Sequence, residues 1–171
     1  MFGRGKREDA RLDFETLYCA NSDAIFRFCY RLSGNRTEAE DLTQEVFVAA
    51  LEGLYRFERR SSARTWLYRI ALYRHRARSE RHEARNISLE SAPELSRPDS
   101  SEQHLWRIAL QDALLKLSPP LREAFVLVKC EGFTCSEAAK LLRIPTGTLK
   151  FRVHSAVQSL QKSLQEVPHA L

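Results

Sequence analysis

Apolar residues recur every three or four positions along most of this chain, a spacing typical of amphipathic helices. It predicts seven helices, over about residues 14–32, 37–54, 63–84, 105–117, 119–130, 135–142 and 146–166. The stripe of the first includes Leu17, Ile25, Phe28 and Leu32. We therefore predict an all-α chain of two small helical domains joined by a flexible linker, the C-terminal domain containing a helix-turn-helix.

Residues typical of helix ends support these boundaries. Residues 33–35 read Ser-Gly-Asn, a common way to end a helix. Thr37 with Glu40 and Thr134 with Glu137 each fit a capping box, in which the two side chains bond to each other's backbone N–H groups. We therefore expect one helix to begin after Thr37 and another after Thr134.

The segment 86–103 interrupts the helical pattern. It reads NISLESAPELSRPDSSEQ, with two Pro, five Ser and no sustained periodicity, which is typical of a linker. We predict an N-terminal domain over residues 13–85 and a C-terminal domain over 104–166, flanked by a flexible N-terminus at 1–12 and a tail at 167–171.

Composition excludes several classes of protein. With 43% hydrophobic and 29% charged residues, the 171-residue chain is globular rather than disordered. Its longest uncharged apolar run, Ala124–Val128, is far short of the roughly 18 residues that span a membrane. Residues 1–10 lack the apolar core of a secretory signal, and four Cys do not make a disulfide scaffold. We expect a soluble cytoplasmic protein.

The distribution of charge says more than the net value of +5. Residues 1–35 carry +1, residues 36–54 carry −4, and residues 55–85 carry +7. Residues 86–103 carry −3 and residues 104–171 carry +4. Blocks of opposite sign suggest a polyanion on one surface and a different partner on another.

The C-terminal pattern of a short helix, a tight break and a longer helix is that of a helix-turn-helix. Such a motif places the first turns of its second helix in the DNA major groove, where cations neutralise phosphates or contact guanine. A small helical bundle with solvated charges fits the same spacing. The candidate duplex-binding residues are Lys140, Arg143, Thr148, Lys150, Phe151, Arg152, His154 and Ser155.

The basic segment interleaves aromatic residues with ten Arg between residues 55 and 85. Bases of single-stranded nucleic acid stack on aromatic rings while guanidinium groups follow the phosphates, so this pattern favours a single-strand site. The alternative is a solvated helix end, with Trp66 in the core.

The remaining polar features do not point to catalysis. The acidic stripe that includes Asp41, Gln44 and Glu45 is most simply a solvated helix face. The adjacent carboxylates Glu40 and Asp41 have no His or Cys near them and point to different sides of a helix. Four residues separate Cys130 from Cys135, which leaves any zinc spacing incomplete. We predict no catalytic residue, metal, cofactor or small-molecule substrate.

Two long stretches resemble one family. AEDLTQEVFVAAL at 39–51 and YRFERRSSARTWLYRIA at 55–71 look like the second conserved region of extracytoplasmic-function (ECF) sigma factors of the sigma-70 family. Residues 112–156 resemble their fourth conserved region. The order and separation of the blocks fit as well.

The resemblance implies a role for each block. The acidic stripe would dock on core RNA polymerase, whose beta-prime and beta subunits are the expected partners, through Asp41, Gln44, Glu45 and Val48. The following loop and helix would capture the unwound −10 strand through Phe57, Arg59, Arg60, Ser61, Arg64, Trp66, Tyr68, Arg69, Tyr73 and Arg76. The last helix would bind the −35 element as duplex. A cognate anti-sigma factor is implied too.

The chain departs from the family's usual pattern at several positions. Tyr73 and Ala77 stand where the family usually has Asn and Asp, and Arg143 replaces the usual Gly of the turn. Phe151 replaces a small residue, and Ser155 a basic one. Fewer cations in the last helix should weaken phosphate anchoring at −35 and reduce its salt dependence.

Two other classes of protein remain as alternatives. A stand-alone operator-binding regulator would use only the helix-turn-helix and would bind duplex DNA without polymerase. A nuclease using Glu40 and Asp41 would cleave in a metal-dependent way. Neither accounts for both the Arg-rich segment and the acidic stripe.

Overall fold

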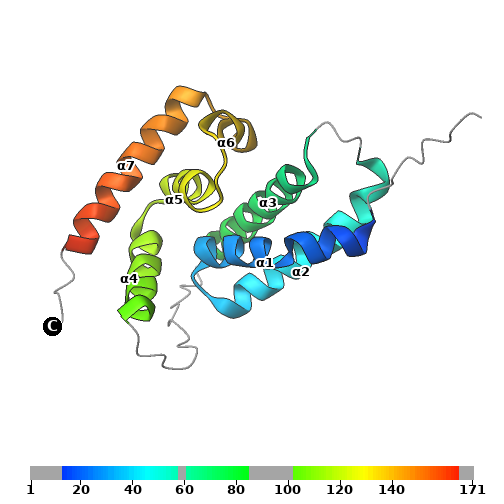
Figure 1. Cartoon of the computed structure of the whole chain (residues 1–171), viewed down its shortest axis with the longest axis horizontal. Helices are drawn as coiled ribbons and strands as arrows, with labels where there is room; N and C mark the ends of the chain where they lie inside the picture. The colour runs from blue at the N-terminus through cyan, green and yellow to red at the C-terminus, as the bar shows by residue number, and fades with distance from the viewer. Residues whose placement is uncertain (1–12, 58–60, 85–101, 166–171) are drawn as a thin grey trace, which may run out of the picture.

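The computed structural model describes residues 13–57, 61–84 and 102–165 (Figure 1). Several predicted features lie outside these residues: the N-terminal segment 1–12, the linker residues 86–101, Arg59, Arg60, and the tail 167–171.

Every regular element in the described residues is helical, as the apolar spacing predicts. The N-terminal half contains α1 (Phe14–Ser33), α2 (Arg36–Gly53), a 3-10 turn η1 (Leu54–Arg56) and α3 (Ala63–Ala84). These three α-helices all contact one another, and their apolar stripes meet in a core (Figure 1). Phe28, Val46 and Leu67 are each 0% exposed there.

The C-terminal half contains the four helical stretches that the sequence predicts. They are α4 (Glu102–Lys116), α5 (Pro119–Phe125) continued by a π-helical turn η2 (Val126–Cys130), α6 (Cys135–Leu142) and α7 (Thr146–Gln165). The long helix α7 contacts α4, α5 and α6 and so holds this half together. Helix α4 begins slightly before its predicted start, within the predicted linker.

Two of the predicted helix ends are confirmed. Gly34 ends α1 with a φ of 75°, a left-handed conformation that suits glycine, and its N–H donates to the carbonyl of Tyr30. Thr134 and Glu137 form both hydrogen bonds of a capping box at the start of α6.

The capping box predicted at Thr37 and Glu40 is wrong. Helix α2 begins earlier, at Arg36, because the side chain of Asn35 accepts the N–H of Glu38 at 2.9 Å. Asn is as strong an N-cap as Thr, and it comes first along the chain. Glu40 then lies one turn inside the helix and pairs with Arg36 at 2.9 Å.

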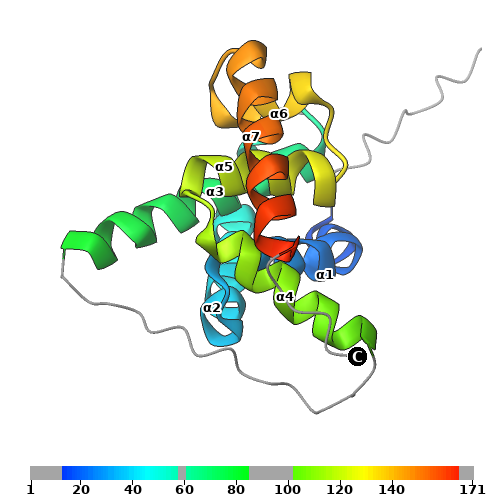
Figure 2. The same ribbon diagram turned by 90° about the vertical axis from the view of Figure 1, so that its left-hand side faces the viewer.

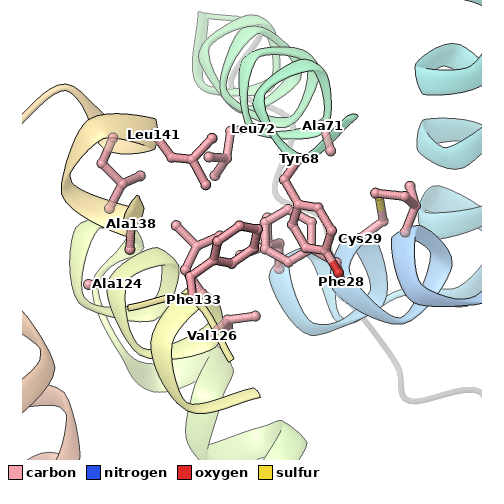
Figure 3. Packing of buried hydrophobic residues seen from close by; sticks show 14 of the residues in the cluster. Phe28, Cys29, Tyr68, Ala71, Leu72, Ala124, Val126, Phe133, Ala138 and Leu141 are labelled. Carbon is pink, nitrogen blue, oxygen red and sulfur yellow. The ribbon is translucent and has the colours of Figure 1, made fainter. Parts of the chain in front are cut away.

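The two halves share one continuous apolar core. Helix α1 contacts α4, α5 and η2, and α3 contacts α6. At their meeting point Tyr68 of α3 lies between Phe28 of α1 and Phe133 of the C-terminal half, with ring centroids 4.8 and 5.0 Å apart (Figure 3). Backbone carbonyls are bonded across the boundary too, since Arg122 donates to the carbonyl of Leu32 at 2.6 Å. The halves therefore form a single body in this arrangement.

Candidate nucleic-acid and polymerase interfaces

The turn before α7 is formed by a residue in an unusual conformation. Arg143 ends α6 with a φ of 56°, in the left-handed region that favours glycine. The N–H of the next residue, Ile144, donates to the carbonyl of Ala139 at 3.0 Å and closes the turn. The short helix, tight turn and long helix of a helix-turn-helix are thus present.

Helix α7 buries one side and presents the other to solvent. Leu149, Val153, Ala156 and Leu160 form its buried stripe against the rest of the C-terminal half. Of the predicted duplex-binding residues, Arg152 and Ser155 are half-buried, and the exposed ones are Lys140, Arg143, Thr148, Lys150, Phe151 and His154. Helix α7 contains no acidic residue, so this face suits a polyanion.

The exposed side of α3 keeps part of the predicted single-strand site. Arg69 and Tyr73 are exposed one turn apart, and 71% of Tyr73 is accessible. Trp66 is half-buried and stacks on Phe57, with ring centroids 4.6 Å apart and planes 25° apart. Ser61, in the loop before α3, is half-buried. Rings and a cation therefore share this end of the N-terminal half.

Tyr68, in contrast, is not available for stacking in this arrangement. It is 0% exposed, and its hydroxyl donates to the carboxylate of Glu131 at 2.5 Å. Burial, followed by the hydrogen bond to Glu131 and then by the Glu131 charge, raises the pKa of Tyr68 above its usual range. The helical spacing places Tyr68 on the buried stripe of α3 with Leu67 and Ala71, which the aromatic-cation pattern does not reveal.

Two predicted strand-binding arginines are also held by the C-terminal half. The guanidinium of Arg64 lies over the rings of Tyr68 and Phe133, 5.2 and 4.5 Å from their centroids, and donates to the backbone carbonyl of Glu131. Arg76 makes two hydrogen bonds to Glu123, at 2.9 and 2.5 Å. Both residues nevertheless stay exposed, so the C-terminal half binds these side chains without burying them.

The sequence patterns did not predict the two carboxylates that make these contacts. Glu123 is 4% exposed, and it shares its side of the predicted helix 119–130 with the buried Val126 and Leu127, three and four positions further on. Glu131 also pairs with Arg31 of α1 at 2.8 Å. A carboxylate on an apolar stripe is a signal for a buried ion pair, because an unpaired buried charge is strongly unfavourable. The sequence gives no comparable signal for Glu131.

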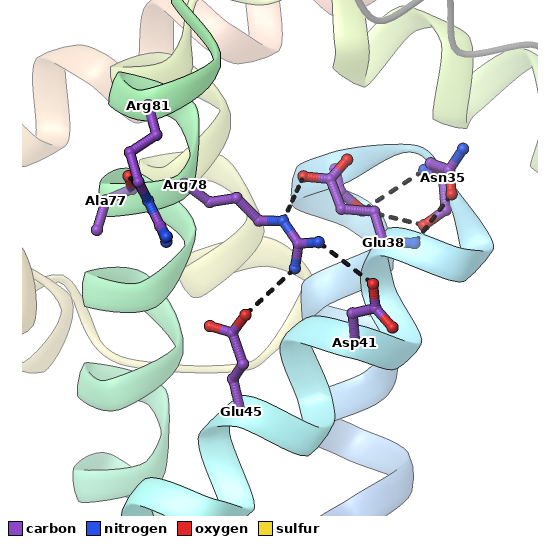
Figure 4. A network of polar contacts seen from close by, with 8 residues as sticks. Asn35, Glu38, Asp41, Glu45, Ala77, Arg78 and Arg81 are labelled. Carbon is purple, nitrogen blue, oxygen red and sulfur yellow. Dashed lines mark hydrogen bonds and ion pairs between the residues drawn. The ribbon is translucent and has the colours of Figure 1, made fainter. Parts of the chain in front are cut away.

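The acidic stripe of α2 faces the end of α3. Arg78 lies 3.2 Å from Asp41, 3.5 Å from Glu45 and 3.9 Å from Glu38 (Figure 4). The Asp41 side chain is still 53% exposed. One arginine thus balances part of this charge without covering it.

The four predicted polymerase-contacting residues line one open hollow. Asp41, Gln44, Glu45 and Val48 form its α2 side, and Arg74 closes it from α3. Val48 is 56% exposed, so an accessible apolar side chain lies beside these carboxylates. Figure 2 shows α2 on the side of the molecule away from α6 and α7.

The thiols and carboxylates of the described residues form no evident reactive or metal site. Burial raises the pKa of the Cys29 thiol to about 12, and burial also raises that of Cys130. All four cysteines, Cys135 and the exposed Cys19 included, are unpaired by disulfides. No group of three metal-ligating side chains comes together in the part of the chain that the structure describes. Within that part no helix is both long and apolar enough to cross a membrane.

An acidic hollow, a basic aromatic helix and a helix-turn-helix on one small helical chain define a DNA-binding protein with a further protein partner. Comparison with known families gives the same division. Residues 17–83 match Sigma-70 region 2, and residues 107–160 match Sigma-70, region 4.

Characterised relatives cover nearly the whole chain. The ECF RNA polymerase sigma factor SigW of Bacillus subtilis is 31% identical, over 94% of this chain and 91% of SigW. The RNA polymerase sigma factor CarQ of Myxococcus xanthus is 33% identical, over 94% of both chains. The chain belongs to the ECF sigma factors of the sigma-70 family.

Solved structures agree with this family assignment. The sigma factor RpoE of Bartonella quintana, in a complex with the anti-sigma factor NepR, superposes with a TM-score of 0.77 at 27% identity. That match covers 91% of this chain and 98% of the other. CnrH, in a complex with the cytosolic domain of CnrY, gives a TM-score of 0.68 at 25% identity, over 90% and 88% of the two chains.

Proposed function

We propose that this chain is a promoter-specificity subunit of RNA polymerase, which binds the core enzyme, recognises −35 and −10 elements, and assists opening of the −10 region. The observation that carries this proposal is the separation of three surfaces of different chemistry on one chain. An acidic hollow suits contact with a partner protein. A basic helix with aromatic residues suits unwound DNA, and helix α7, which has no acidic residue, suits duplex DNA. The chain would act in the cytoplasm, with catalysis left to the polymerase.

The hollow on α2 is the proposed polymerase-docking surface. Asp41 and Glu45 supply charge, Gln44 supplies an amide, and the exposed Val48 supplies apolar contact. Interfaces of this kind combine a central apolar contact with polar groups around it. Arg78 holds the two carboxylates in place from α3, and Arg74 borders the hollow.

The exposed end of α3 is the proposed −10 site. Arg69 and Tyr73 are accessible as the structure stands, and Trp66 stacked on Phe57 lies at the same end. Arg64, Tyr68 and Arg76 belong to this site only when the C-terminal half moves away, because their side chains are bonded to Glu131 and Glu123. Flipping and stacking unpaired bases costs a few kcal/mol, which such contacts offset.

The arrangement in which the C-terminal half packs on α3, here called the packed arrangement, therefore restricts capture of the unwound strand. We infer that the halves separate when the chain joins the polymerase, because promoter elements at −35 and −10 cannot both be reached while region 4 covers α3. An anti-sigma partner that holds the halves together would keep the chain inactive. One similar solved structure, that of RpoE, is a complex with the anti-sigma factor NepR.

Reconstitution with core RNA polymerase on a library of random promoters tests the proposal. Transcripts should start downstream of a shared two-part element, and the chain without polymerase should select no such element. A chain that binds one duplex sequence tightly by itself and adds no promoter selectivity to the polymerase would instead be an operator-binding regulator. Metal-dependent cleavage of the library by the chain alone would show instead that the chain is a nuclease, the other alternative considered from the sequence.

A further inference from the structure

Phe151 occupies an exceptional position on α7. It is 69% exposed, whereas Leu149, Val153 and Ala156 are buried within the same turns. At 100° per residue these three buried residues lie on one side of the helix, and Phe151 lies almost directly opposite them. A large apolar ring is therefore held at the outermost point of the helix.

The surroundings of Phe151 make the ring still more prominent. One turn earlier comes Gly147, beside which a side chain would meet no other atom within 4 Å. Helical side chains lean toward the N-terminus of their helix, so the ring leans toward a turn that has no side chain at Gly147. Its neighbours are polar or cationic, since Lys150 and His154 are both exposed.

These features favour DNA over a protein as the group that the ring contacts. Protein interfaces place several apolar residues around an aromatic anchor, whereas Phe151 is the one exposed large apolar side chain among the described residues of α6 and α7. Helix α7 also lacks acidic residues. In the major groove the apolar feature of a base edge is the C5-methyl group of thymine.

We infer that Phe151 is a specificity-determining residue that contacts a thymine C5-methyl group in the −35 duplex. The inference rests on the proposed function and adds a particular base and atom to it. The ring at residue 151 favours thymine at one base pair of the −35 element, because the methyl group packs against it. Lys150 contributes charge instead. Ser155 replaces a basic residue of the family, so the last helix has fewer cations than usual. Specificity at −35 would then depend more on the apolar contact of Phe151.

Deoxyuridine, which differs from thymine only by lacking the methyl group, gives a direct test. Promoter duplexes are first selected from a random −35 library with polymerase carrying the wild-type chain. Each −35 thymine is then replaced by deoxyuridine, and binding is measured with wild-type and Phe151→Ala chains. Removing one buried methyl should weaken wild-type binding by about three- to fivefold at one position. Phe151→Ala should bind the two duplexes equally.

Lys150→Ala is the matched control, because it alters the adjacent exposed residue. It should weaken binding to every duplex and keep the wild-type ratio between thymine and deoxyuridine. If no thymine shows a methyl effect that depends on Phe151, the inference is wrong even though the −35 element is bound. If Phe151→Ala weakens the thymine and deoxyuridine duplexes by the same factor, the ring does not contact the methyl group and the inference is wrong. If binding does not depend on the −35 sequence at all, the proposed function itself fails.

Discussion

The hydroxyl of Tyr68 donates a hydrogen bond to the carboxylate of Glu131, 2.5 Å away, and so joins the basic helix of region 2 to region 4. Glu131 also accepts from Arg31 at 2.8 Å, which places one carboxylate between two helices of the N-terminal half. Tyr68, which the proposed function assigns to strand capture, thus serves here as a contact between the two halves.

Tyr68→Phe should destabilise the packed arrangement, because it removes one hydrogen bond to a charged group and leaves the ring in place. Such bonds contribute about 1.5–3 kcal/mol. We expect the thermal midpoint to fall by several degrees. Tyr73→Phe is the matched control, since Tyr73 is 71% exposed, and it should shift the midpoint very little. Equal midpoints for the two variants would show that the Tyr68 bond does not hold the halves together.

Gly34→Ala should be more destabilising than a glycine change elsewhere in the chain. A left-handed φ of 75° costs alanine about 1–2 kcal/mol, and the added methyl would also overlap the side chain of Leu115 on α4. Gly147→Ala, in a helical position with free space, should be neutral or stabilising. Urea denaturation of both variants measures the difference, and a Gly34→Ala chain as stable as wild type would contradict the geometry.

Arg143→Gly should stabilise the free chain and weaken DNA binding. Glycine adopts a φ of 56° without strain, although it loses more backbone entropy on folding, so the expected gain is at most about 1 kcal/mol. The same change removes an exposed cation beside α7. Thermal denaturation should give a higher midpoint, and affinity for −35 duplexes should fall at low salt. A lower midpoint would mean that the Arg143 side chain stabilises the turn.

His75 should make stability depend on pH below neutrality. Its Nδ1 atom is buried without a partner, and burial lowers the pKa of the imidazole below its usual 6.5, with Glu123 opposing and Arg122 and Arg76 reinforcing the shift. Above pH 6.5 both folded and unfolded chains hold neutral His75, so stability is complete. As pH falls below 6.5 the unfolded chain takes up a proton first, and stability is lost until the lowered pKa is reached.

His75→Gln isolates this effect, because glutamine does not titrate. Between pH 7.5 and 5.5 the unfolding free energy of the variant should fall less than that of wild type. His154→Gln, which alters an exposed histidine, should keep the wild-type pH dependence. A His75→Gln chain with an unchanged pH dependence would remove His75 as the cause.

The fold could be predicted from sequence because helix formation here follows local apolar spacing and capping. The bounds of α3 and α6 agree with their predicted ranges, and the Thr134 capping box is present. Two residues, Asn35 and Thr37, could each cap the start of α2. Asn35 comes first along the chain and is the N-cap. Local patterns rank such caps poorly, because Asn and Thr are both favoured N-caps and either can bond a free N–H.

The candidate sites could be predicted only where all their residues lie on one face of a single helix. The hollow that includes Asp41 and Val48 follows from residues spaced three and four apart over two turns of α2. The burial of Tyr68 does not, since it depends on Phe133 and Glu131, which are more than 60 residues further along the chain. Contacts between halves require the tertiary arrangement, and no spacing within α3 encodes them.

Affinity for core RNA polymerase is the most direct test of the proposed docking surface on α2. A chain with Asp41→Ala, Gln44→Ala and Glu45→Ala loses two carboxylates and one amide from the hollow. A chain with Glu15→Ala, Asp23→Ala and Gln161→Ala loses the same groups from exposed positions elsewhere. Both should keep the wild-type helical circular dichroism. We predict that the first binds core polymerase at least tenfold more weakly, at roughly 1.4 kcal/mol per tenfold, and that the second binds as wild type. Equal affinity of all three chains would contradict the proposed docking surface.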